Sequence, residues 1–171
     1  VEPSIPFALG LLLTNDGAGA ASNVQISSGQ PMIVDNEQGL LVAFQLIGTQ
    51  VGLDQLSPSL SVNLGEVAPG ETEVVQWLMT STLEGEFIEY TATLQGENAL
   101  GQPGLSLIDS LDIFPMTHVV RALAPDDDLL PDFLTNEILD VDELPERLHR
   151  SDGPVEDVTA LTSARVSTTP R

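Results

Sequence analysis

The residues best suited to chemistry in this chain are closely spaced carboxylates near its C-terminal end. Three consecutive aspartates are followed by a fourth, which gives the candidate ligands Asp126, Asp127, Asp128 and Asp132. Ca²⁺ binds about six to eight oxygen atoms, mostly from carboxylates and carbonyls in loops. The spacing lacks the glycine and the final bidentate glutamate of an EF-hand loop. Calcium at these four residues is therefore one hypothesis, and a solvated acidic hinge is the other.

Other reaction chemistry has less support in the sequence. The chain has two histidines and no cysteine, and this does not predict a zinc or iron site. We expect His118 to be a surface or packing residue at a strand edge, and His149 to be solvated in the acidic segment. No Gly-x-Ser-x-Gly elbow or glycine-rich phosphate loop is present. A carboxylate pair of the glycosidase type would need a cleft. The sequence thus predicts a protein that is not an enzyme, without catalytic or cofactor-binding residues.

The charge of the chain is strongly one-sided. It has 26 acidic residues and five arginines, no lysine, and a formal net charge of -21. No arginine occurs before Arg121, so residues 1–120 carry fourteen carboxylates and no fixed positive charge. Binding to nucleic acid or to an anionic membrane surface requires basic residues. We therefore expect neither partner. We also expect no membrane insertion, because no apolar run approaches the roughly 20 residues that span a bilayer. Unpaired carboxylates predict a fold that salt or divalent cations stabilise.

The elements that must position these residues are strands. Apolar residues alternate with polar ones in short segments, and glycine, proline or asparagine separates one segment from the next. Long helices are not expected, because glycine, proline and β-branched residues interrupt every long window. The pattern predicts an all-β fold, an antiparallel sandwich of about seven to eight strands. The expected strands lie within 7–14, 24–26, 32–34, 39–47, 60–64, 75–79, 88–94 and 105–113, and Val119 and Val120 close the last run.

The sequence also predicts how the chain is divided. Residues 1–123 form the expected sandwich, with Trp77 in its core and the indole N–H donating to a backbone acceptor. Residues 124–171 form an acidic linker or extension, since 124–157 alone hold twelve of the carboxylates. Prolines in this part limit any helix to a few turns, so we expect it to be partly helical or extended.

Two turn motifs carry a resemblance to a known family. The first spans Asn15 to Val24 and contains Asn-x-Gly-x-x-x-Ala-x-Asn-Val, and the second is Ala68-Pro69-Gly70-Glu71, followed by a strand with Trp77. Over roughly residues 7–114 the chain resembles the CARDB-like group of bacterial immunoglobulin-like domains, which occur in very large surface and secreted proteins. The resemblance implies an immunoglobulin-like fold and an extracellular or cell-surface location. It supplies no catalytic residues.

Three functions follow as expectations. The first is a non-enzymatic structural or interaction module that serves adhesion, spacing or assembly, with a protein partner, neighbouring domain or subunit. The second is a self-assembling filament subunit, a homo-oligomer in which residues 1–6 or 155–171 add a strand to an open sheet edge. The third is an accessory carbohydrate-binding domain, which would need exposed aromatic side chains.

Overall fold

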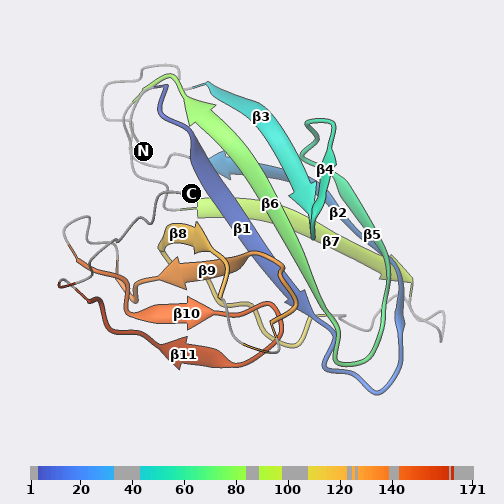
Figure 1. Cartoon of the computed structure of the whole chain (residues 1–171). Helices are drawn as coiled ribbons and strands as arrows, with labels where there is room; N and C mark the ends of the chain where they lie inside the picture. Colours follow the sequence, from blue (N-terminus) through green and yellow to red (C-terminus); the bar gives the residue numbers. More distant parts are fainter. Residues whose placement is uncertain are drawn as a thin grey trace, which may run out of the picture.

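The computed structural model describes residues 4–32, 43–83, 89–97, 108–122, 125, 127–138, 143–161 and 163. Over these residues the chain forms strands and no helix, which confirms the all-β prediction. The strands are arranged in three antiparallel sheets (Figure 1). Their bounds are β1 (Phe7–Thr14), β2 (Ala21–Met32), β3 (Phe44–Val51), β4 (Asp54–Leu56), β5 (Val62–Val67), β6 (Thr72–Ser81), β7 (Glu89–Glu97), β8 (Met116–Val120), β9 (Asp132–Thr135), β10 (Arg147–His149) and β11 (Val155–Asp157).

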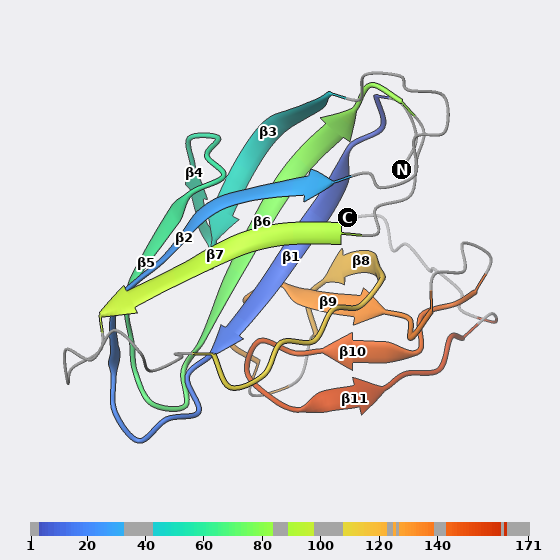
Figure 2. The ribbon, with the colours of Figure 1, turned by 180° about the vertical axis from the view of Figure 1, so that it is seen from behind.

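Two of the sheets face each other and enclose the core. One has the strand order β1-β6-β3-β4 and the other β5-β2-β7 (Figures 1 and 2). The alternation seen in the sequence explains this arrangement, because every second residue of a strand points to the same side. The buried core cluster comes from both sheets and consists of Ile26, Val62, Val75, Trp77 and Met79. The described residues between positions 7 and 97 therefore form a sandwich-like pair of sheets.

The two turn motifs lie together at one end of this sandwich. The Asn15 backbone N–H donates to Glu71 O (3.0 Å), and Gly70 N–H donates to Asn15 O (2.6 Å). The Asn15 side chain donates from Nδ2 to both Gly19 O and Val67 O, at 2.9 Å each.

 Three of these four bonds cross between the two turns, and the fourth, to Gly19, closes the first turn on itself.

The third sheet has the order β11-β10-β9-β8 and packs on the outer side of β1 (Figure 2). At Gly10 of β1, an added Cβ would meet three ring carbons of Phe133 at 2.6–2.9 Å, so the aromatic ring lies directly on the glycine backbone. Leu130, just before β9, approaches Gly52 in the same way, at 3.5 Å from an added Cβ. The third sheet therefore covers part of the face that the first sheet turns away from the core.

Several expectations about individual strands change with the structure. Residues 108–113, the described part of the strand expected at 105–113, form no strand. In β3 the register shifts between Leu46 and Gly48, so Thr49 and Val51 face inward where simple alternation would turn them outward. Most of the strand expected at 32–34 and the first part of the one at 39–47 lie outside the described residues.

Over its described residues the C-terminal extension contains three short strands and no helix. β9, β10 and β11 all lie after residue 123, and β8, which lies before it, pairs with β9. The division into a sandwich of 1–123 and an extension of 124–171 stays a prediction. The described residues contain no helix that is long and apolar enough to span a bilayer.

Candidate functional site

The predicted calcium ligands take part in a network of hydrogen bonds beside β9. Asp132 is completely buried, and its Oδ2 accepts from Ala122 N at 2.6 Å. Its Oδ1 accepts from the N–H and the hydroxyl of Ser151, at 2.9 and 3.2 Å. The Ser151 hydroxyl also lies 2.8 Å from Asp128 Oδ1. Asp132 thus links the segment after β8 to the segment after β10, which is a structural role for a buried carboxylate.

The neighbouring aspartates cap their own loop. Asp127 Oδ2 accepts from Leu129 N at 3.0 Å, and Asp128 Oδ1 accepts from Leu130 N at 2.8 Å. Asp127 Oδ1 is buried and has no partner. Asp126 lies outside the described residues, and within the described part no three acidic, histidine or cysteine side chains are grouped as metal ligands. Calcium at these aspartates stays a prediction.

The two histidines have different surroundings. His118 is exposed on β8. His149 is half-buried on β10, where its Nε2 lies 3.0 Å from Thr135 Oγ1 and its ring centre lies 4.6 Å from that of Phe114. Burial and the nearby charge of Arg147 lower the pKa of His149 below 6.5. The prediction that His149 is solvated is therefore wrong, because β10 turns its ring onto Phe114.

Trp77 occupies the centre of the core, as predicted. Its side chain is 1% exposed, and Nε1 donates to Ser59 O at 3.1 Å. The same carbonyl accepts from Thr49 Oγ1 at 2.8 Å, and Ser59 N–H donates back to Thr49 Oγ1 at 2.9 Å. Trp77 is thus engaged inside the fold and does not present a surface for a sugar or partner.

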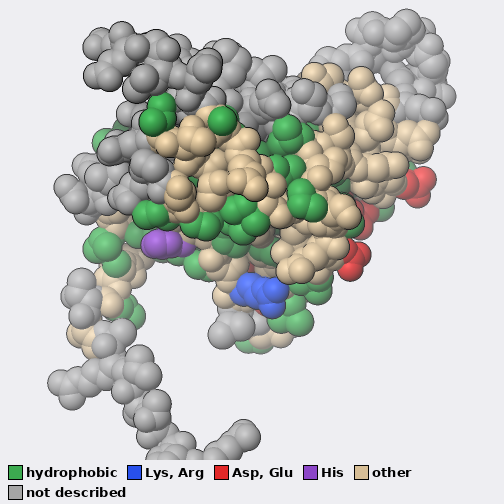
Figure 3. Space-filling view, turned by 90° about the horizontal axis from the view of Figure 1, so that it is seen from above, with side chains coloured by type: hydrophobic (Ala, Val, Ile, Leu, Met, Phe, Trp, Pro, Cys, Tyr) green, Lys and Arg blue, Asp and Glu red, His purple; other side chains and the backbone are tan. Residues whose placement is uncertain are grey.

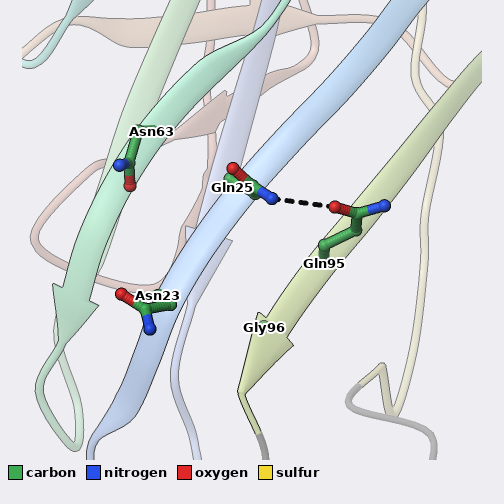
Figure 4. A pocket seen from close by; sticks show the side chains of 5 residues that line it. All are labelled: Asn23, Gln25, Asn63, Gln95 and Gly96. Carbon is green, nitrogen blue, oxygen red and sulfur yellow. Dashed lines mark hydrogen bonds between the residues drawn. The ribbon is translucent and has the colours of Figure 1, made fainter.

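A group of uncharged amides lies on the outer face of the β5-β2-β7 sheet (Figure 4). The strand register places Gln25 of β2 opposite Asn63 of β5 on one side and opposite Gln95 of β7 on the other. The three side chains are exposed and form a row across the three strands. Asn23 lies two residues before Gln25 on the same strand. We call Asn23, Gln25, Asn63 and Gln95 the amide row.

The amide row lines a shallow depression of about 360 Å³, together with Gly96. This volume is near the lower end of ligand pockets in proteins. Gly96 contributes no side chain, so the backbone of β7 is accessible there. None of the five lining residues carries a charge, although the chain as a whole has a net charge of -21.

Local structure fixes the orientation of these amides. Gln25 Nε2 donates to Gln95 Oε1 at 2.8 Å (Figure 4). Asn63 Oδ1 accepts from Gly65 N at 2.9 Å, where Gly65 has a φ of 75° and lies opposite Val24 at a shift in register. Asn23 has a φ of 51°, a left-handed conformation that asparagine tolerates better than most residues. The depression is therefore built by two hydrogen bonds and an irregularity in β2.

The amide row was not predicted as a site from the sequence. Its only signal was periodicity, because Gln25 and Asn63 alternate with the buried Val24, Ile26 and Val62 and so had to point outward. Which outward residues become neighbours depends on strand order and register, and these are properties of the folded sheet.

The comparisons with known proteins provide no relative: no family model, curated protein or solved structure matches the chain. The binding properties of the site therefore follow only from its own residues.

Proposed function

We propose that the chain is a non-enzymatic structural and interaction module of a secreted or cell-surface protein. The observation that supports this proposal is the structural role of three polar or aromatic side chains that could otherwise bind a ligand. Asp132, Asn15 and Trp77 each use their polar atoms to bond distant parts of the backbone. Polar groups with satisfied bonds inside a fold are typical of structural cross-links.

The strand pairing supports an immunoglobulin-like relationship with two departures. In that fold, strands C and F pair in one sheet and strands B and E in the other. Here β3 pairs with β6 and β2 with β5, which would correspond to those two pairs. β1, however, pairs with β6 on the edge where the last strand, G, would lie, and β7 pairs with β2 on the edge where the first strand, A, would lie. The immunoglobulin-like assignment and the resemblance to CARDB-like domains therefore remain part of this proposal.

A second candidate is assembly by strand addition, which exposed apolar side chains in extended segments favour. Leu111 and Ile113 are 70% and 73% exposed and alternate with polar residues outside any sheet. Such a segment has the pattern of a strand that could pair with the edge of a neighbouring sheet. In contrast, Val155–Asp157, from the expected C-terminal donor segment, already pairs with β10 of its own chain.

Light scattering coupled to size exclusion, at increasing protein concentration, tests both candidates. A structural module of one chain is expected to stay monomeric and to unfold in one cooperative transition. Assembly that grows with concentration and is lost in Leu111→Asp/Ile113→Asp would favour strand addition. Ile138→Asp is a matched control, because Ile138 is also exposed, at 64%, but lies outside both candidate donor segments. A chain that does not fold cooperatively would contradict the module proposal.

A further inference from the structure

The outer face of the β5-β2-β7 sheet carries a row of exposed amide side chains that a purely structural spacer does not require. We propose that the amide row is a binding site for a neutral, hydroxyl-rich ligand, namely an uncharged glycan chain. This proposal goes beyond the structural role proposed above and does not depend on it.

The hydrogen-bonding groups left free in the row match those of a sugar. Because Gln25 Nε2 and Gln95 Oε1 bond to each other, Gln25 Oε1 is available as an acceptor and Gln95 Nε2 as a donor. Asn63 Nδ2 is a second available donor, since Asn63 Oδ1 accepts from Gly65 N. Asn23 adds both an acceptor and a donor. A sugar hydroxyl both donates and accepts, so neighbouring hydroxyls can bond to such alternating groups.

The net charge of the chain and the uncharged lining of the depression both favour a neutral ligand. The described carboxylates give the chain a negative field, and an anionic polysaccharide would be repelled by it. A cationic ligand would find no carboxylate among the five residues that line the depression. On the face seen in Figure 3, described carboxylates gather at one edge, one arginine patch lies nearer the middle, and the rest of the described surface is largely uncharged. Charge therefore favours an uncharged ligand for the depression itself.

Preorganisation favours binding, and the absence of stacking limits its strength. The Gln25–Gln95 and Asn63–Gly65 hydrogen bonds already restrict three side chains, so binding immobilises fewer of them. No aromatic side chain is among the five lining residues. The site then depends on a few neutral hydrogen bonds, and we expect a Kd on the order of 1 mM.

The test is an NMR titration of the ¹⁵N-labelled chain with linear oligomers of glucose, mannose and N-acetylglucosamine, and with oligogalacturonate as the anionic comparison. At least one neutral oligomer is expected to shift the signals of Asn23, Gln25, Asn63 and Gln95, including their side-chain NH₂ groups. Gln95→Ala and Gln25→Ala are each expected to weaken binding by about threefold to tenfold, the loss of one neutral hydrogen bond.

Gln45→Ala is the matched control, because Gln45 is an exposed amide on β3 in the other sheet. This variant is expected to bind like the parent chain. Three results would overturn the proposal: no localised shift with any neutral oligomer at about 20 mM, well above the expected Kd; equal shifts with oligogalacturonate; or equal losses in Gln45→Ala and Gln95→Ala. None of these results bears on the structural module, whose test is cooperative folding.

Discussion

Gly10 of β1 offers a direct test of how the third sheet is attached. An alanine Cβ at this position would lie 2.6–2.9 Å from three ring carbons of Phe133, which is 5% exposed. Real Cβ contacts are longer, so the ring or the backbone of β9 must shift. Overpacking of this kind costs about 1–3 kcal/mol. Replacing a strand glycine with alanine also stabilises the fold by about 0.5–1 kcal/mol, because the unfolded chain has less backbone entropy to lose. We therefore expect Gly10→Ala to lower the free energy of unfolding by about 1–2 kcal/mol.

Gly48→Ala supplies the control for this measurement. Gly48 lies in β3 of the same sheet, and an added Cβ there has no neighbour within 4 Å. The variant is expected to be neutral or slightly stabilising, because it gains the entropy without the clash. Urea denaturation followed by the fluorescence of Trp77, the single tryptophan, gives both values.

A double-mutant cycle identifies the contact itself. Phe133→Leu removes the ring atoms that an alanine at position 10 would meet, at a cost of about 1 kcal/mol. In that background Gly10→Ala is expected to become neutral, which gives a coupling energy of about 1–3 kcal/mol. Equal effects of Gly10→Ala and Gly48→Ala, or no coupling with Phe133→Leu, would show that the third sheet does not pack on β1.

Three further predictions follow from the electrostatics and hydrogen bonds. Asn15→Ala is expected to destabilise the fold by about 1–3 kcal/mol, because Val67 O and Gly19 O lose their donor. Gln55→Ala, at an exposed amide on β4, serves as the comparison in the same urea titration. Burial, and then the charge of Glu71, raise the pKa of Glu73 above its ordinary 4.5. The folded state therefore binds the Glu73 proton more tightly than the unfolded state does. The free energy of unfolding falls as the pH rises from 4.5 through the raised pKa. Glu73→Gln should therefore be more stable than the parent at pH 7, by less than about 1 kcal/mol, and lose this advantage below pH 4, with a pH-independent difference refuting the assignment. The net charge of -21 predicts a melting temperature that rises with NaCl, and indifference to both NaCl and Ca²⁺ would contradict it.

The opposite sign is expected for His149. Its pKa is lowered in the folded chain, so the unfolded chain binds a proton more readily, and stability falls as the pH drops through 6.5. Comparing the urea midpoints of the parent and His149→Gln at pH 7.5 and pH 5.5 measures this contribution. A parent chain whose midpoint changes no more than that of the variant would show that His149 is not buried against Phe114.

Local patterns in the sequence are sufficient to predict the all-β character and the position of most strands in the sandwich. Alternating apolar residues must face one side of a strand, and this period placed Leu9 and Leu11 of β1 and Trp77 of β6 in the core. Asn15 and the Pro69-Gly70 pair marked the turns, because asparagine, proline and glycine favour the backbone angles that turns require. These are local properties, which a chain carries before it folds.

Which residues become neighbours across strands and sheets depends on the folded chain. The register shift in β3 reverses the alternation of inward and outward side chains after Leu46. No local preference in the sequence predicts such a bulge. Gln25 and Gln95 are seventy positions apart, yet pairing of β2 with β7 brings their amides within 2.8 Å. The contact of Phe133 with Gly10 likewise depends on how one sheet docks on another. Neighbours across strands and sheets are set by strand order, register and packing, and these arise only when the whole chain is folded.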